Sequence, residues 1–360
     1  MKKLKILIVS SLALDTGSAI RASNIAKALK KAGVIVDFIK PYSKTLAFKL
    51  DFLLTLPRYF LRVIFSKADY VLTVKSYPNV GIPILIKKLL GGKIIIDTDD
   101  LSYAYSTGIW NFFSKICQEL FIPLASLHTY HNPRLRKYLV NKLNISINKT
   151  YQLKQGVDLG LFKANINSKQ QNLLIKKFKL KNKKILVYTG HFDIACDLKY
   201  ILKAMPMVFK NNPEVRLVVI GDGKRKKEFQ LLSSKLGIDK NIIWVGSLLL
   251  KKVSVFLNLA DICLLYYQPK KANLYRSSLK IREYLALGKK VVCNNVGELK
   301  NFKDYTYQTT SRLIDYSKMI QKVLTGLNDN RQKKGEVFIK KEYNWEMIAR
   351  NFISRLQTLT

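Results

Sequence analysis

The chain has 360 residues and a mass of 41.4 kDa, which is enough for two ordinary domains. Hydrophobic residues make up 48% of it, so the chain can bury a core and is not disordered as a whole. Its 63 basic and 24 acidic residues give a formal net charge of +39. Such an excess is typical of proteins that bind nucleic acid, an anionic membrane or phosphorylated substrates.

The positive charge is spread along the whole chain. Residues 1–163 hold 25 basic and 9 acidic residues, and the remainder holds 38 and 15, which excludes a basic arm attached to a neutral enzyme. Most of the basic residues are lysines, whereas forked contacts to phosphates and bases favour arginine. A lysine-rich composition without a specific role is therefore a second interpretation.

Cysteine and histidine usage argues against a disulfide framework and against a zinc site. The four cysteines are sparse and lack metal-ligand spacing, so a reducing, cytoplasmic setting is expected. The three histidines form no zinc motif. These residues are Cys117, Cys196, Cys263, Cys293, His128, His131 and His191.

The N-terminal stretch "MKKLKILIVSSLAL" has two interpretations. A basic start followed by an apolar run resembles a signal peptide, but Asp15 and Arg21 follow the run quickly. The run also fits a buried parallel strand, and the residues after it have helical period from about Ala19 to Ala32. The strand is the favoured prediction.

Residues 45–65, "TLAFKLDFLLTLPRYFLRVIF", form the longest apolar stretch, but it contains four charged residues. No charge-free run reaches the roughly 18–20 residues that a membrane-spanning helix needs. The stretch fits a basic amphipathic segment lying on a membrane surface. A pair of ordinary surface helices on either side of Pro57 is the equal alternative.

Strand-like runs alternate with helix-like runs, and this alternation begins twice. The first series contains "ILIVSS", "VIVDFIK", "DYVLTVK" and "KIIIDTDD", and the second contains "KKILVYTG", "EVRLVVIGDG", "IIWVGSL", "DICLLYYQP" and "KKVVCNN". Short β-branched runs separated by helices are typical of parallel sheets. The pattern predicts an α/β fold of two Rossmann-like domains, joined by the polar segment at residues 163–172.

Two glycine-containing loops follow predicted strands. Gly17 and Ser18 lie where the first strand leads into a helix, and helix N-termini favour phosphate groups. Gly221 and Asp222 lie in "VIGDGKRKKEF", at a strand end where open α/β sheets bind ligands. Neither loop has a specific phosphate-binding pattern, so ordinary strand–helix turns remain an alternative, and the basic run at 224–227 fits a solvated helix start.

A third motif is "NLYRSSLKIREYLALGKKVV". Ser278 precedes a helix whose start can hold a diphosphate through backbone N–H groups, with Lys280 adding charge. Glu283, one turn further, can accept hydrogen bonds from ribose hydroxyls. A surface ion pair between Lys280 and Glu283 is the alternative.

Asp97, Asp99 and Asp100 form a carboxylate cluster at the end of a predicted strand. Such a cluster fits a contact to an acceptor hydroxyl or a sugar. A helix-start cap explains it equally well.

The third motif resembles the donor-binding signature of family-4-type retaining glycosyltransferases of the GT-B fold, the glycosyl transferases group 1. That signature is an E-x7-E stretch with an "LK…EYMALGKPVV"-like core. "QLKQGVDLGLFKA", "VRLVVIGDG" and "YNWEMIARNF" resemble three further family segments in the same order, and the N-terminal strand, loop and helix fit the opening. The resemblance covers nearly the whole chain.

The resemblance implies two domains facing a cleft: residues 1–165, with a C-terminal helix at 345–360 packing back on them, and residues 170–342. It implies a hexosyltransferase that uses a UDP- or GDP-sugar and needs no metal. The donor would contact the backbone of Ser278 and Leu279, with Glu283 on the ribose. Further expected donor contacts are Gly17, Ser18, Gly221, Asp222, Arg276 and Lys280, and the expected catalytic residues are Asp97, Asp99 and His191.

The chain departs from the family pattern at four positions. The first Glu of E-x7-E falls at Tyr275, and the family's His of the first domain falls at Asp99. The two cations that usually contact the diphosphate fall at His191 and Cys196. A protonated His191 would partly substitute for one of them, Cys196 cannot substitute for the other, and Lys199, Arg276 or Lys280 are other sources of charge.

The preferred hypothesis is a glycosyltransferase at the inner face of the cell membrane, acting on a lipid-linked or glycan acceptor. A catalytically degenerate GT-B protein that binds a nucleotide or a partner is the alternative. A nucleic-acid-binding protein is less favoured, because the chain has no RRM, KH, zinc or helix-turn-helix signature.

Overall fold

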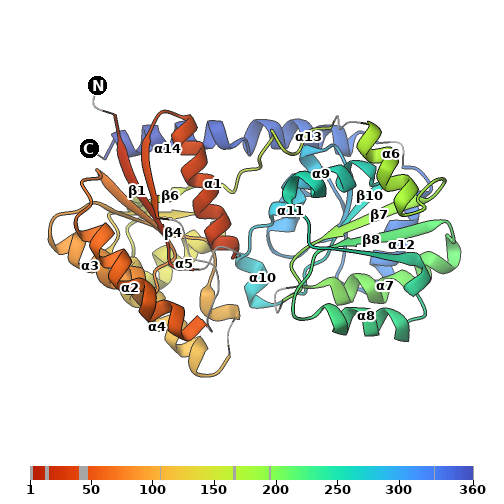
Figure 1. Cartoon of the computed structure of the whole chain (residues 1–360), viewed down its shortest axis with the longest axis horizontal. Coiled ribbons are helices and arrows are strands. Elements are labelled where there is room, and N and C mark those ends of the chain that lie inside the picture. The colour runs from red at the N-terminus through yellow and green to blue at the C-terminus, as the bar shows by residue number, and fades with distance from the viewer. Residues whose placement is uncertain are drawn as a thin grey trace. The chain divides into compact units, whose positions relative to one another are not determined.

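A computed structural model describes residues 3–12, 16–39, 48–105, 107–164, 168–193, 196–327 and 329–359, with no side-chain information for 48–53 and 168. The chain divides into two compact units (Figure 1). The first contains residues 1–155, 275–277 and 345–360, and the second contains 156–274 and 278–344. Each unit is built on one six-stranded sheet in which every strand pair is parallel.

The first sheet has the strand order β2-β1-β3-β4-β5-β6. Its order changes direction between β1 and β3, which are the adjacent strands at the switch point of the sheet. The strands are β1 (Lys5–Ser10), β2 (Ile35–Ile39), β3 (Tyr70–Val74), β4 (Ile94–Thr98), β5 (Leu127–Tyr130) and β6 (Thr150–Gln152). The helices are α1 (Gly17–Lys31), α2 (Phe48–Ile64), α3 (Pro78–Leu89), α4 (Ile109–Phe121), α5 (Pro133–Leu143) and α14 (Trp345–Gln357), with short 3-10 turns at Ser102–Tyr105, Ile122–Leu124 and Ile147–Lys149.

The second sheet has the order β12-β11-β10-β7-β8-β9, which is the strand order of a Rossmann fold, with its switch point between β7 and β10. The strands are β7 (Lys184–Thr189), β8 (Val215–Ile220), β9 (Ile242–Gly246), β10 (Ile262–Leu265), β11 (Lys290–Asn294) and β12 (Tyr307–Thr309). The helices are α6 (Ser168–Lys177), α7 (Leu198–Asn211), α8 (Lys226–Lys235), α9 (Leu250–Leu259), α10 (Lys271–Tyr275), α11 (Leu279–Ala286), α12 (Leu313–Leu324) and α13 (Arg331–Glu342), with 3-10 turns at Asp239–Asn241 and Gly297–Phe302.

The N-terminal apolar run is a strand of the first sheet, as its sequence predicts. Ile6, Leu7, Ile8 and Val9 of β1 are buried, because helices cover both faces of the sheet and neither face meets water. The following residues 13–15 lie outside the described residues. Helix α1 then begins at Gly17, with Thr16 as its N-cap, two residues before the predicted start.

Helix α14 belongs to the first unit, although it closes the chain. Its buried residues Ile348, Phe352 and Leu356 share one apolar core with α1 and the first sheet (Figure 1). The Tyr70 hydroxyl of β3 donates a hydrogen bond of 3.0 Å to the Leu356 carbonyl. Burial of one apolar stripe is what attaches an amphipathic helix to a sheet.

The boundary between the units lies earlier in the chain than the sequence predicts. The unit division falls after Gln155, whereas residue 165 was the expected end of the first domain. The reason is packing: Val157 and Phe162 are buried in the core of the second unit, and the Val157 N–H donates to the Tyr343 carbonyl. Residues 165–167 of the predicted linker lie outside the described residues.

A single helix, α2, replaces the predicted pair of helices around Pro57. Proline inside a helix removes one backbone hydrogen bond and usually kinks or breaks the helix. Here Tyr59 and Val63, which follow the proline, are buried in the core of the first unit, and α2 packs along α3. Tertiary packing therefore outweighs the local cost of Pro57. No helix in the described part of the chain is long and apolar enough to cross a membrane.

Two glycines hold the ends of β7 and β8 together. Gly221 has φ +144°, and a Cβ atom there would collide with the Gly190 carbonyl oxygen. The two loops are joined by hydrogen bonds from the Gly190 N–H to the Ile220 carbonyl and from the Phe192 N–H to the Asp222 carbonyl, both of 2.9 Å. Only glycine allows this approach of one backbone to another.

We expect Gly221→Ala to lower the free energy of unfolding by about 2 kcal/mol, because it adds both a collision and a strained backbone angle. Gly17→Ala is the matched control, since a Cβ atom at Gly17 meets nothing within 4 Å and its φ is not positive. Its stability should stay the same or rise by about 0.5 kcal/mol. Urea unfolding of both variants measures the difference. Equal stabilities would contradict the conclusion that only glycine fits at position 221.

Candidate functional site

In the second unit, the predicted donor-binding residues gather at the carboxyl edge of the sheet. The loops after β7 and β8 contain Gly190, His191, Gly221 and Asp222, and α11 begins beside them. A Cβ atom on Gly190 would touch the Lys280 ammonium group, so the β7 loop and α11 are in contact. This edge, next to the switch point, is where open α/β sheets bind ligands.

Ser278 caps α11 and is held by a buried ion pair. Its hydroxyl accepts the Ile281 N–H, and its own N–H donates to Glu298 Oε2 at 2.9 Å. The Arg282 guanidinium pairs with Glu298 and donates to the Ser278 carbonyl at 2.6 Å. Because Glu298 accepts the Ser278 N–H, that group does not point to a ligand. The expected contact of the Ser278 N–H with a diphosphate is therefore not available, whereas Leu279, the other residue expected to contact the diphosphate, opens the first turn of the helix.

The Arg282–Glu298 pair was not predicted from the sequence. Both side chains are almost fully buried, and the guanidinium lies 4.5 Å from the centre of the Tyr343 ring and 5.5 Å from that of Phe302. Glu298 follows a glycine after β11, and no recognisable motif marks it. The side chains that position α11 come from residues 16 or more positions apart, so spacing alone could not identify them.

The Lys280 ammonium lies beside Tyr188 of β7. Its Nζ lies 3.2 Å from the Tyr188 hydroxyl and 4.6 Å from the centre of the same ring. This places an ammonium group beside Gly190, next to the position at which the family pattern carries a cation. Lys199, another predicted source of charge, lies instead over the Tyr200 ring at 5.1 Å.

Glu283 is half-buried on α11. Burial raises the pKa of its carboxyl group to about 7, and the attraction of Lys280 only partly opposes this effect. Within the described ranges, no side chain donates a hydrogen bond to Glu283. A half-buried carboxyl group with this environment is a candidate for ligand binding rather than for stability.

Asp222 is tied to its own loop. It accepts the Gly223 N–H and pairs with Lys226 at 2.8 Å, and the hydrogen bond from Lys226 lowers the pKa of Asp222 below its usual value. The basic run at 224–227 is a solvated helix start, as predicted, because α8 begins at Lys226 and Arg225 pairs with Glu228.

The two departures in the β7 loop differ in structure. His191 is exposed and lies near Asp222, whose pKa it also lowers. Cys196 is buried, 3.2 Å from the Tyr188 hydroxyl, and like the other three cysteines it is free. Residues 275–277 lie with the first unit, where Tyr275 packs against the core and the Arg276 carbonyl accepts from Asn132 Nδ2 at 3.3 Å.

In the first unit, Asp97 is a structural residue, which corrects its predicted catalytic role. Its side chain is fully buried and pairs with Arg21 of α1 through two contacts of 2.5 and 2.9 Å. Thr129 of β5 donates a further hydrogen bond of 2.6 Å. Arg21 also reaches Gln155 and the Leu153 carbonyl. With its oxygens used in this way and no access to solvent, Asp97 cannot contact a substrate.

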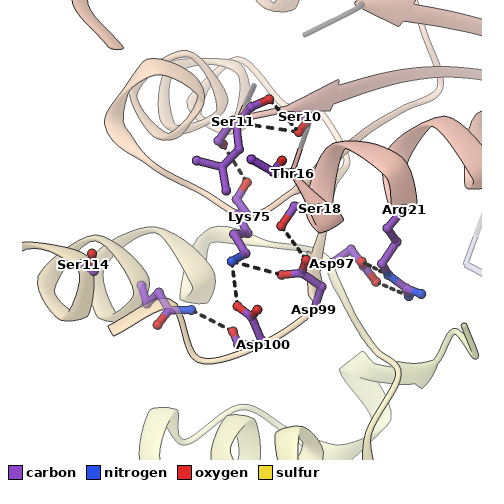
Figure 2. A network of polar contacts seen from close by, with 12 residues as sticks. Ser10, Ser11, Thr16, Ser18, Arg21, Lys75, Asp97, Asp99, Asp100 and Ser114 are labelled. Carbon is purple, nitrogen blue, oxygen red and sulfur yellow. Dashed lines mark hydrogen bonds and ion pairs between the residues drawn. The ribbon is translucent and has the colours of Figure 1, made fainter. Parts of the chain in front are cut away.

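Asp99 and Asp100 form a separate network with Lys75 (Figure 2). Ser18, in the first turn of α1, donates to Asp99 Oδ2 at 2.6 Å. Lys75, directly after β3, lies 2.6 Å from Asp100 Oδ1 and 3.6 Å from Asp99 Oδ1. The predicted cluster therefore exists, but Asp97 faces Arg21, while Asp99 and Asp100 face Lys75. The charged residue at the end of β3 is the signal in the sequence that could have identified Lys75.

The environment of Asp99 makes its charge sensitive to pH. Burial raises the pKa of Asp99 to about 7, Lys75 and the Ser18 hydrogen bond oppose this, and Asp100 and Asp97 add to it. Burial disfavours the Lys75 ammonium, but Asp100 and Asp99 outweigh it, so the pKa of Lys75 is raised. Among the described residues, no group of three or more His, Cys, Asp or Glu side chains is arranged to hold a metal ion.

Comparisons with known proteins show which proteins the chain is similar to. Residues 170–307 match the family model described as "Glycosyl transferases group 1". The chain is 24% identical over 287 residues to TuaH of Bacillus subtilis (strain 168), named as a teichuronic acid biosynthesis glycosyltransferase; the match covers 77% of this chain and 70% of that protein. The chain is a glycosyltransferase of the GT-B fold.

Solved structures share the fold of this glycosyltransferase over almost its full length. Sucrose-phosphate synthase from Thermosynechococcus elongatus matches with a TM-score of 0.77 and 15% identity, covering 99% of both chains. HepE from Anabaena, in complex with UDP-glucose, matches with a TM-score of 0.71 and 13% identity, covering 99% of this chain and 100% of HepE. At such identities the likeness shows the fold and not the substrate.

We expect the stability of this glycosyltransferase to depend on the charge of Asp99. A carboxyl group whose folded-state pKa is raised from 3.8 to about 7 stabilises the fold at low pH, and this contribution is lost as the pH rises through 7. Asp99→Asn should therefore reduce the loss of stability between pH 4 and pH 8, measured by urea unfolding. Asp37→Asn, at an exposed ion pair with Arg62, is the control and should leave the pH dependence unchanged.

Proposed function

We propose that the protein is a retaining glycosyltransferase that moves a sugar from a nucleotide-diphosphate sugar to a glycan or lipid-linked acceptor in cell-surface polysaccharide synthesis. The observation that carries this proposal is the start of α11, where the first turn of the helix, the Lys280 ammonium and the Glu283 carboxyl group lie together at the sheet edge. TuaH, named for teichuronic acid biosynthesis, and HepE, which binds UDP-glucose, support the acceptor and donor classes.

The donor is proposed to bind the second unit. Its diphosphate would accept hydrogen bonds from the first turn of α11 and from Lys280, because helix N-termini and ammonium groups both stabilise anions. Glu283 would accept hydrogen bonds from ribose hydroxyls, and Gly221 would leave room for the base. Arg276 and the start of α1, with Gly17 and Ser18, are further proposed contacts.

In the proposed reaction, the bond from the anomeric carbon to the diphosphate breaks while the acceptor oxygen bonds to the same face of the sugar. The proton of the acceptor hydroxyl passes to the departing phosphate oxygen. The role of the protein is to stabilise the negative charge that develops on the diphosphate, and Lys280 is the cation placed for it. Asp99 and the exposed His191 are the remaining candidates for contacts to the reacting sugars.

A catalytically degenerate protein is the second candidate, because a buried Cys196 and a Tyr275 packed into the first unit replace family residues that contact the donor. This candidate predicts nucleotide binding without turnover. Hydrolysis of a nucleotide sugar would exclude it.

We expect UDP or GDP to raise the melting temperature of the protein. Lys280→Met should weaken nucleotide binding by tenfold or more, because a charge-assisted hydrogen bond contributes about 1.5–3 kcal/mol. Glu283→Gln should weaken it less, and Glu346→Gln, at an exposed ion pair on α14, should have no effect. Calorimetry with both nucleotides and slow hydrolysis of UDP-glucose are the measurements. If no nucleoside diphosphate binds, the proposed function is wrong.

We also propose that the first unit works at an anionic membrane surface. Helices α2 and α3 pack side by side over one face of the first sheet, and α4 packs against α3 (Figure 1). Their outward positions include eleven exposed large apolar residues, namely Leu54, Leu61, Phe65, Ile82, Leu85, Leu89, Leu90, Ile109, Phe112, Ile116 and Leu120, where Phe65 and Leu90 directly follow their helices. The three helices carry six basic and two acidic residues, so their charge favours anionic lipid over a second copy of this basic chain.

A triple variant with serine in place of Ile109, Phe112 and Leu120 tests this surface, since these residues are 77, 64 and 61% exposed. It should bind vesicles that contain phosphatidylglycerol at least tenfold more weakly than wild type. The matched control is a triple variant with serine in place of Leu231, Leu249 and Val337 of the second unit, which are 63, 78 and 67% exposed. Vesicle sedimentation measures both, and added salt should weaken the wild-type binding. Equal effects of the two triple variants, or equal binding to neutral vesicles, would refute this surface.

A further inference from the structure

Lys75 lies at the switch point of the first sheet. It directly follows β3, and Ser11 follows the neighbouring strand β1. Ligands of open α/β sheets bind outside the carboxyl ends of the strands at this point. The second unit binds its proposed donor at the corresponding edge, so the switch point of the first sheet is the place for the acceptor.

The backbone of Lys75 is in a conformation that side chains rarely adopt. Its φ is +63°, which is unusual for any residue except glycine. The conformation is held from three sides: the Lys75 N–H donates to the Asp97 carbonyl at 3.2 Å, and its carbonyl accepts from the hydroxyls of Ser11 at 2.9 Å and Thr73 at 2.6 Å. Such conformations persist only where the surroundings enforce them, and they occur mainly at functional sites.

The Lys75 side chain lies between two carboxylates. The side chain is 10% exposed, and its ammonium lies between Asp100, at 2.6 Å, and Asp99, at 3.6 Å (Figure 2). Two neighbouring buried carboxylates repel one another unless a cation lies between them. Asp99 thus faces Lys75 with one oxygen and the Ser18 hydroxyl, in the first turn of α1, with the other.

We propose that Lys75 is the positioning residue of the acceptor site: it holds Asp99 and Asp100 apart and keeps the Asp99 carboxylate oriented to accept a hydrogen bond from a sugar hydroxyl. This inference rests on the proposed function. Lys75 itself touches no substrate, since its ammonium is used by the two carboxylates. The substrate class is a neutral polyhydroxylated acceptor, because the groups at this edge are mainly hydrogen-bond acceptors.

The charged and titratable groups around Asp99 come from several elements. Lys75 follows β3. Asp97 and Asp100 lie on either side of Asp99 in the sequence, and the His131 ring, after β5, contacts the Asp99 carbonyl. Arg21 of α1 is paired with Asp97 and leaves Lys75 as the cation that faces Asp99 within the described residues. Removing Lys75 should therefore change the pH at which Asp99 loses its proton.

The test compares Lys75→Met, Lys75→Arg and Lys93→Met, the last at the opposite edge of the same sheet. Sugar transfer or slow hydrolysis of UDP-glucose is followed from pH 5 to pH 9, and the melting temperature is followed over the same range. We expect Lys75→Met to lower kcat by tenfold or more, to move the acid limb of the pH profile up by about one unit, and to leave KM for the donor within twofold. Lys75→Arg should restore the profile, and Lys93→Met should match wild type.

The melting temperature separates this inference from the proposed function. Without Lys75, the carboxylates ionise at greater cost, so the melting temperature of Lys75→Met should fall more steeply as pH rises than that of wild type. If wild type turns over no nucleotide sugar, the proposed function fails, while this steeper fall still supports the role of Lys75. The role of Lys75 is refuted if Lys75→Met leaves unchanged both the pH dependence of the melting temperature and the pH profile of kcat. It is also refuted if kcat falls with no shift in its pH profile and Lys75→Arg does not restore it.

Discussion

In each unit, one arginine is buried against one carboxylate in the opening turns of a helix, and the geometry of the sheet edge depends on this pair. Arg21 ties α1 to Asp97 at the end of β4, and Arg282 ties α11 to Glu298 in the turn after β11. Removing one partner of such a pair costs about 3–5 kcal/mol, because the other charge remains buried. Replacing both by apolar groups is often neutral, so the pairs are better explained by orientation than by stability. Each fixes the helix start that points at a proposed substrate.

The two units use this arrangement differently. At α11 the buried pair accepts the Ser278 N–H and donates to the Ser278 carbonyl, so the proposed anion contacts are the next N–H groups and the Lys280 ammonium. At α1 the pair with Asp97 leaves Ser18 to bond Asp99, and the edge is rich in acceptor oxygens. An edge of donors suits a diphosphate and an edge of acceptors suits hydroxyl groups. This chemistry supports the proposed binding of the donor to the second unit and of the acceptor to the first.

Much of the fold could be predicted from the sequence because its signals are local. Continuous apolar runs such as residues 5–10 and 184–189 predict strands buried on both faces, and glycines mark the loops after β1, β7 and β8. The site was predicted less completely. Lys280 and Glu283 follow from the spacing on one helix, but Lys75 and Glu298 act on residues 24 and 20 positions away, and only the register of the sheet brings them there. Pro57 shows the same limit, since packing against α3 keeps a helix that local propensity would interrupt.

The net charge of +39 contributes little to either site directly. Arg21, Lys75, Arg225 and Arg282 are paired with carboxylates, and the Lys280 ammonium contacts the Tyr188 hydroxyl. A cation that is paired with a carboxylate binds a further anion less well. In the proposed membrane contact, the excess of lysines would act over longer distances, as an attraction to an anionic surface that decreases with salt. The exposed apolar side chains of α4 would supply the second component of that contact, because neither a few basic residues nor a few exposed apolar side chains alone hold a protein on a membrane.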